Sequence, residues 1–173
     1  MGEPTEPEPV KLFAGLLTGM PELLEEVEDG LKREFGPVDC RSGPIPFDFT
    51  DYYREEMGEG IERSFLSFQR LIDPGRLPEI KLLTNELEKK ISRRGKYDVS
   101  RPVNIDPGYL GLSKTVLATT KNYSHRLYLE RGIYAEVTLQ YSEGRFQPLP
   151  WTYPDYRTDK YLDFFARVRE IYR

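Results

Sequence analysis

The sequence predicts an α+β protein in which helices cover an antiparallel sheet. Apolar residues change along the chain between the alternation of a strand and the three- and four-residue spacing of a helix. Two strand-like segments follow each other between the first two long helix-like segments, which favours antiparallel pairing. The 173 residues, 38% of them hydrophobic, suffice for one core. We expect a flexible acidic arm at residues 1–9, where Pro and Glu dominate, and a single α+β domain over residues 10–173.

The first elements are a strand, a helix and an edge strand. Residues 11–19 are a short apolar run of the kind found in buried strands. Residues 20–37 favour a helix, because apolar side chains recur every three or four residues until Gly36-Pro37 ends the pattern. Residues 38–49 contain two prolines, which remove ladder donors and therefore favour a strand at the sheet edge.

The next elements complete a mixed core. A short helix over residues 50–58 leads into residues 62–72, whose aromatic residues favour a strand, although the spacing of a helix fits them nearly as well. A long helix is predicted at residues 77–95, with basic residues near its end. Residues 101–106 form a strand that ends at the turn signal Asp106-Pro107-Gly108. This order of strands and helices is that of the split βαβ, or ferredoxin-like, core.

A β-hairpin near residue 131 extends this core. A three-residue loop from Glu130 to Gly132 pairs Leu129 with Ile133. Because side chains alternate between the faces of a strand, this register places Arg126 opposite Glu136.

A second hairpin and a closing helix complete the fold. A four-residue loop from Lys121 to Ser124 pairs Thr120 with His125, so the strand before the loop lies beside residues 125–129. Residues 158–172 form an amphipathic helix with one apolar stripe.

Composition argues against several classes of protein. The formal charge of −4 gives the whole surface no strong attraction for phosphate backbones, which argues against nucleic-acid binding. No apolar run approaches the roughly 18 residues of a membrane-spanning helix, so no membrane partner is expected. The single cysteine, Cys40, cannot close an internal disulfide and no leader opens the chain, so we expect a cytoplasmic protein.

Polar and titratable side chains gather at the predicted strand ends and turns of the second half of the chain. We expect His125 and Asp106 to be the catalytic residues, with His125 transferring a proton. Lys121 and Arg126 would bind an anion, and Glu136 would orient Arg126. The full set of predicted ligand-binding residues is Asn104, Lys121, Arg126, Glu136, Tyr128, Asp155 and Arg157.

These residues also have structural interpretations. Arg126 and Glu136 could form an ordinary cross-strand ion pair. A hairpin tip is a normal place for a polar residue such as Lys121. Asp155 and Arg157 could hold down the proline-rich stretch before the last helix.

Familiar cofactor and catalytic motifs are missing from the sequence. In the segment PGYLGLSKT, Ser113 precedes the lysine, where a P-loop needs glycine. The single glycine between the first strand and helix falls short of G-x-G-x-x-G. No C-x-x-C, H-E-x-x-H or G-x-S-x-G string occurs, so no metal site is predicted and the cofactor is left unassigned.

Four strings together resemble a family of bacterial and archaeal proteins, the domain-of-unknown-function family 4416. The strings are FDFTDYYREEMG, RPVNIDPGYL, LATTKNYSHRLYLERGIYAEVTL and WTYPDYR. The resemblance covers essentially the whole chain after the acidic arm. It implies a stand-alone single-domain protein and brings no activity, cofactor or catalytic residue with it. Some relatives are labelled GTP-binding, whereas this chain lacks the P-loop residues.

Two functional hypotheses follow. The first is a cytoplasmic binding protein or enzyme whose partner is a small anionic ligand, with a nucleotide or a phosphate ester as examples. The second is a non-enzymatic protein-interaction module, in homodimeric form, that uses the tyrosine-rich hairpin face and the Trp151 loop. Binding of RNA to the open sheet face is a third hypothesis based on fold analogy, and the net acidity argues against it.

Overall fold

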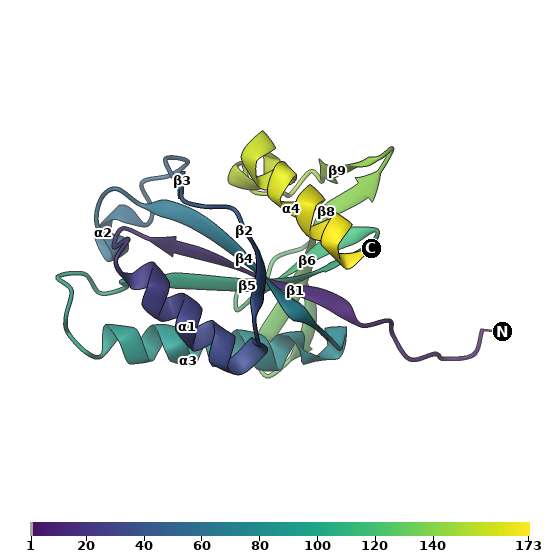
Figure 1. Ribbon diagram of the computed structural model, residues 1–173, viewed down its shortest axis with the longest axis horizontal. Helices are drawn as coiled ribbons and strands as arrows, with labels where there is room; N and C mark the ends of the chain where they lie inside the picture. Colours follow the sequence, from purple (N-terminus) through teal and green to yellow (C-terminus); the bar gives the residue numbers. More distant parts are fainter. Residues whose placement is uncertain (1) are drawn as a thin grey trace.

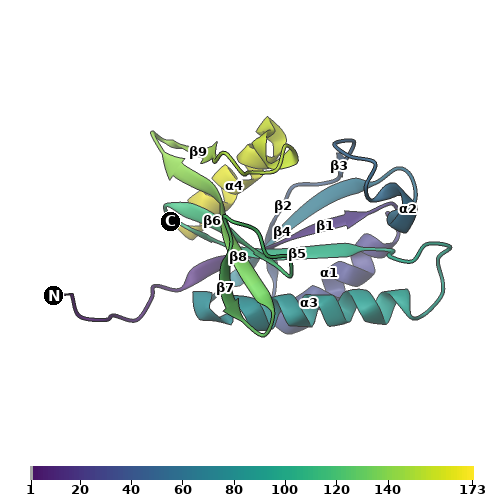
Figure 2. The same cartoon turned by 180° about the vertical axis from the view of Figure 1, so that it is seen from behind.

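The computed structural model describes residues 2–173 and contains one nine-stranded sheet with helices on both faces (Figures 1 and 2). The strands are β1 (Val10–Thr18), β2 (Val38–Arg41), β3 (Ile45–Pro46), β4 (Glu62–Ile72), β5 (Asn104–Gly111), β6 (Lys114–Thr119), β7 (Leu127–Glu130), β8 (Ile133–Ser142) and β9 (Arg145–Pro148). The helices are α1 (Leu23–Phe35), α2 (Arg54–Met57), α3 (Leu77–Ser92) and α4 (Asp159–Tyr172), with short 3-10 helices η1 (Pro74–Arg76) and η2 (Asp155–Arg157).

The strand order is β2-β4-β1-β5-β6-β8-β7, with β3 beside β4 and β9 beside β8. Every ladder is antiparallel. The prediction of an α+β fold with an antiparallel sheet is therefore confirmed. The proline-containing segment after α1 lies at the sheet edge, as expected, because β2 has β4 as its one neighbour.

β1 is buried along its whole length because both faces of the sheet are covered at this point. Leu12 and Leu16 belong to the core that packs against α1 and α3. Phe13 points the other way and meets Phe165 of α4 edge-on, with ring centroids 4.9 Å apart. A strand covered on both faces needs no polar alternation, which explains the continuous apolar run in the sequence.

The predicted turn at Asp106-Pro107-Gly108 is wrong, because these residues lie inside β5. Gly108 is needed there for close packing, since an added Cβ would lie 2.5 Å from both Phe13 Cζ and the Val116 carbonyl oxygen. β5 pairs with β6 only from Gly108 onward, so Pro107, which has no N–H to donate, has β1 as its one ladder neighbour. The residues of β5 that precede Gly108 therefore do not pair with β6.

The predicted pairing of Thr120 with His125 is also wrong. β6 pairs with β8, with Ala118 opposite Ala135, and β7 lies on the other side of β8. β8 has ten residues and carries the buried apolar side chains, so it takes the inner position. All four residues of β7 are exposed, as suits a short edge strand. Residues 120–126 consequently cross from one side of β8 to the other.

The predicted register of the hairpin near residue 131, formed by β7 and β8, is confirmed over most of its length, with Tyr128 opposite Tyr134. The three-residue loop is wrong, because Glu130 pairs with Ile133 and leaves a two-residue turn of Arg131-Gly132. Both turn residues have positive φ, as the favoured two-residue hairpin turn requires. An irregularity after Tyr128 absorbs the extra residue.

The acidic segment at the start of the chain is separate from the sheet. Residues 2–9 form no helix or strand and extend away from the other elements (Figure 1). The Tyr172 hydroxyl of α4 donates a hydrogen bond to the Pro9 carbonyl at 2.7 Å. Within residues 2–173, no helix combines the length and the apolar character needed to cross a membrane.

Candidate functional site

A cavity of about 510 Å³ opens where β5 and β6 stop pairing. Its floor comes from β4, α3 and β5, and its opposite wall comes from residues 117–126, β8 and residues 153–156. Residues 47–53, between β3 and α2, close a further side. The cavity is thus a consequence of the local sequence, because Pro107 lies where the β5–β6 ladder ends.

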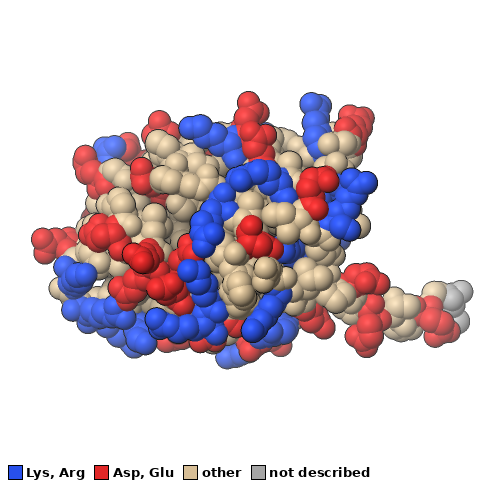
Figure 3. All heavy atoms as spheres, viewed as in Figure 1, with Lys and Arg blue, Asp and Glu red and all other residues tan. Residues whose placement is uncertain are grey.

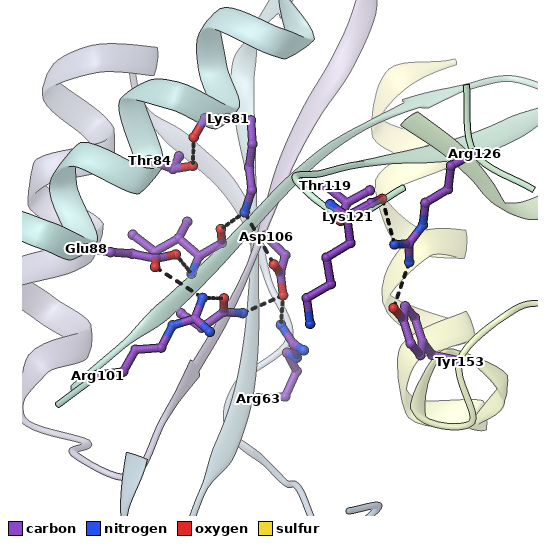
Figure 4. Close-up of polar contacts among 12 residues, drawn as sticks. Arg63, Lys81, Thr84, Glu88, Arg101, Asp106, Thr119, Lys121, Arg126 and Tyr153 are labelled. Carbon is purple, nitrogen blue, oxygen red and sulfur yellow. Dashed lines mark hydrogen bonds and ion pairs between the residues drawn. The ribbon is translucent and has the colours of Figure 1, made fainter. Parts of the chain in front are cut away.

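Asp106 is the centre of the cavity floor (Figure 4). Its Oδ2 accepts hydrogen bonds from Asn104 Nδ2 at 2.6 Å and Arg63 Nη1 at 3.1 Å, and its Oδ1 lies 3.6 Å from Lys81 Nζ. Burial raises the pKa of Asp106, but the charges of Lys81 and Arg63 lower it by more than burial raises it, so the pKa lies below its usual value. The side chain remains 28% exposed. An ionised carboxylate therefore faces the cavity.

Two charged residues of α3 hold β5 in place beside the cavity (Figure 4). Lys81 Nζ donates to the Ile105 carbonyl at 2.9 Å, and Glu88 accepts from the Ile105 N–H at 2.6 Å. Arg101 donates to Glu88 at 3.3 Å and also to the Asn104 side-chain oxygen. Burial raises the pKa of Glu88, although Lys81 and Arg101 oppose this effect.

Arg63 is a buried cation of the floor. Its Nη2 lies 3.9 Å from Asp155, and burial raises the pKa of Asp155. Burial lowers the pKa of Arg63, but the surrounding acidic groups, Tyr156 and Asp106 foremost, raise it by more than burial lowers it. The guanidinium therefore stays charged. Arg63 Nε and the hydroxyls of Tyr156 and Tyr161 are buried and have no hydrogen-bond partner among residues 2–173.

Arg126 is fixed in the opposite wall by three partners, two of which, Lys121 and Tyr153, are drawn in Figure 4. Its Nε donates to Glu136 at 2.8 Å, its Nη1 to the Lys121 carbonyl at 3.0 Å, and its Nη2 to the Tyr153 hydroxyl at 2.8 Å. Its guanidinium also lies 4.6 Å from the ring centroid of Tyr123. The Arg126 and Glu136 side chains are each 2% exposed, so their ion pair is buried rather than a solvated surface contact.

Lys121 differs from the other cations of the cavity. Its ammonium forms no ion pair with any carboxylate among residues 2–173. It lies 5.3 Å from the ring centroid of Tyr52. Figure 4 shows the Lys121 side chain between the group around Asp106 and the pair of Arg126 and Tyr153. Its positive charge is therefore the one most open to a ligand.

A comparison of the sequence with models of known protein families gives a match. The family model described as "Domain of unknown function (DUF4416)" matches residues 8–172. The chain belongs to the DUF4416 family. This finding confirms the resemblance inferred from the four sequence strings. Neither the curated proteins nor the solved structures give a match to the chain. For this member of the DUF4416 family, functional proposals therefore depend on the geometry of the cavity.

Six of the nine predicted site residues line the cavity of this DUF4416 protein. They are Asn104, Asp106, Lys121, Arg126, Glu136 and Asp155. They come from β5, the crossing segment after β6, β8 and η2. The structure thus brings together side chains that lie up to 51 positions apart in the sequence, from Asn104 to Asp155.

The other three predicted residues lie outside the cavity. His125 Nε2 lies 3.1 Å from Glu136, and its ring is stacked between Tyr123 and Trp151, so it contacts the cavity through Glu136. Tyr128 is exposed on β7. Arg157 donates hydrogen bonds to three loop carbonyls and thereby holds the loop before η2; the acceptors belong to Leu149, Pro150 and Thr152.

Sequence reasoning missed three cations and several rings of the cavity. The missed residues are Arg63, Lys81, Arg101, Phe47, Phe49, Tyr52, Tyr53, Tyr123, Tyr153 and Tyr156. One signal was available for Lys81. It lies on the helix face that carries Leu77, Thr84 and Ile91, and a charged residue on a buried face needs a partner.

Among the residues that line the cavity, cations outnumber carboxylates, although Glu88 behind the lining pairs with Arg101. The lining includes Arg63, Lys81, Arg101, Lys121 and Arg126 against Asp106, Glu136 and Asp155. This excess is local, because the whole chain carries a formal charge of −4 and acidic and basic side chains are interspersed on the face drawn in Figure 3. No group of three or more His, Cys, Asp and Glu residues among residues 2–173 could hold a metal ion. The arrangement therefore favours an anion over a metal cation.

Proposed function

We propose that the cavity binds a small organic anion, with phosphate esters, nucleotides included, as the first class to test. The observation that carries this proposal is the excess of cations in the cavity of an acidic chain. A volume of about 510 Å³ also lies within the range of about 300–1,000 Å³ that is typical of small-molecule sites. Partial burial strengthens the attraction, because water screens charges less in such a site.

The side chains divide the work of binding. Lys121 contacts the anionic group, and Arg126, held by Glu136, supplies a second positive charge. Asp106 accepts a hydrogen bond from a hydroxyl or amino group of the same ligand. If a reaction follows binding, Asp106 is the carboxylate that faces the ligand, although its lowered pKa makes it a weak proton acceptor at neutral pH, and His125 acts through Glu136.

Calorimetric titration of the protein with phosphate esters and small dicarboxylates tests the proposal. Lys121→Gln removes the open charge, and Lys114→Gln is the matched control because Lys114 is exposed at the start of β6, outside the cavity. We expect Lys121→Gln to weaken binding at least about tenfold, since a hydrogen bond to a charged group contributes roughly 1.5–3 kcal/mol. Equal affinities of the two variants would refute the role of the cavity.

We also propose that β1, α1, β2, β4, α3 and β5 form a ferredoxin-like core and that the protein works in the cytoplasm. The spatial order β5-β1-β4-β2, with α1 and α3 on one face, supports the first statement (Figure 1). The lone thiol of Cys40 suits a reducing compartment. An experimental structure with another strand order, or fractionation of the protein outside the cytoplasm, would contradict these statements.

A homodimeric interaction module is the second candidate function, and the edge strand β7 favours it. Leu127 is 75% exposed and Tyr128 is 60% exposed, with the Trp151 ring partly exposed nearby in the loop before η2. An exposed apolar edge strand is a template for pairing with another chain. Light scattering after gel filtration decides this point: a dimer that Leu127→Lys dissociates supports the module, and a monomer rejects it.

A further inference from the structure

We infer, on the basis of the proposed function, that the anion bound in this cavity carries a planar ring close to its negative charge. Six aromatic side chains among residues 2–173 are exposed, and four of these line this one cavity. The four are Phe49, Tyr52, Tyr123 and Tyr153. Exposed rings leave apolar faces unburied, so their concentration at one cavity provides a surface on which another ring can stack.

The charges of the cavity lie directly beside these rings. Lys121 Nζ is 5.3 Å from the ring centroid of Tyr52, and Arg126 Cζ is 4.6 Å from that of Tyr123. An anionic group in contact with Lys121 therefore leaves the rest of the ligand beside Tyr52. A hydroxylated chain at that place would leave the tyrosine face uncovered by apolar atoms, whereas a planar ring would cover it.

Tyr52 is the rim residue that folding explains least. The Tyr153 hydroxyl oxygen accepts a hydrogen bond from Arg126, and Tyr123 packs under the same guanidinium, so both support the wall of the cavity. Tyr52 is 63% exposed and meets Tyr53 edge-on at 5.1 Å between centroids. Its substitution therefore separates ring binding from the stability of the fold.

Two kinds of molecule share this chemistry, a nucleoside phosphate and an aromatic carboxylate. Both place an anionic group near a planar ring. Phe47, Tyr53 and Tyr156 add further ring surface to the lining. Asp106 can accept a hydrogen bond from a sugar hydroxyl in the first kind or from a ring substituent in the second.

Calorimetric titration with AMP, 4-hydroxybenzoate and ribose 5-phosphate tests the inference. At least one ring-bearing probe should bind about tenfold or more tightly than ribose 5-phosphate, and the preferred probe identifies which kind of molecule fits. Tyr52→Leu should reduce this preference about tenfold without changing the affinity for ribose 5-phosphate. Tyr128→Leu is the matched control, because Tyr128 is 60% exposed but lies outside the cavity, and it should leave all three affinities unchanged.

The outcomes separate this inference from the proposal beneath it. If ribose 5-phosphate binds as tightly as both ring-bearing probes and Lys121→Gln weakens all three, anion binding stands and the ring inference is overturned. An equal effect of Tyr52→Leu and Tyr128→Leu on the ring preference also overturns it. Failure of all three probes to bind overturns the ring inference together with the phosphate-ester proposal.

Discussion

Asp106 pairs the two buried cations of the cavity floor, Arg63 and Lys81. Asp106→Asn preserves the shape of the side chain but removes its charge. We expect this change to lower the free energy of unfolding at neutral pH by about 3 kcal/mol, because removing one partner of a buried ion pair leaves the others uncompensated. Urea denaturation measures the effect, and Asp163→Asn, on the exposed side of α4, is the control that should change little.

The pH dependence of stability should reveal the same carboxylate. The pKa of Asp106 in the folded protein is lowered from an ordinary value of 3.8, so the ionised group stabilises the fold above that value. This contribution is lost as the pH falls through the folded pKa. The difference in unfolding free energy between wild type and Asp106→Asn should therefore stay constant from neutral pH to about pH 4 and shrink below it. A difference that grows on acidification would contradict this assignment.

Residues of the site differed in how far sequence could reveal them. Polar residues at strand ends and turns, such as Lys121 and Asp155, were identifiable because sites form where rigid elements end. Arg63 was not, because it lies at the start of β4 between Glu62 and Ser64, where a polar residue is unremarkable, and its partner Asp106 is 43 residues away. Tertiary contacts alone decide whether such an inward charge is paired.

At the scale of elements, the junction of β5 with β6 depends on a glycine. A Cβ at Gly108 would lie 2.5 Å from the Val116 carbonyl oxygen, which belongs to β6. This backbone atom can move only if the ladder shifts, so we expect Gly108→Ala to destabilise the fold by about 3 kcal/mol. Gly111→Ala in the same strand meets nothing within 4 Å and should change stability by less than about 0.5 kcal/mol. Equal melting temperatures for the two variants would contradict this account.

Element types were more predictable than element pairing. The spacing of apolar residues predicts α1, α3 and α4, because it follows the face that each helix buries. A short apolar run predicts β1, and the composition of residues 62–72 favours β4. The signal at Asp106-Pro107-Gly108 describes a local backbone preference, and packing against Phe13 overrides it. β6 could pair with β7 or with β8, and it pairs with β8 because β8 buries more apolar surface. The sequence pattern of one hairpin cannot predict this choice, because the choice compares two strands.

At the scale of the whole molecule, the cavity joins two parts of the sheet. β5 and β6 share four paired positions, from Gly108 to Gly111, and the strands on either side belong to different parts of the sheet order. Asp106 belongs to one part, and Lys121 and Glu136 belong to the other. A ligand that contacts both sides should therefore stabilise the molecule as a unit, by about 2.7 kcal/mol at a hundred times its dissociation constant.

Hydrogen exchange should show this coupling directly. A saturating probe that binds in the titrations should slow amide exchange in residues 47–53 and in residues 117–126, which line the cavity on separate sides. Lys121→Gln at the same probe concentration should show weaker protection in both segments. Protection confined to β7 and rising with protein concentration would instead indicate pairing of edge strands between copies, and would favour the interaction module over the anion-binding cavity.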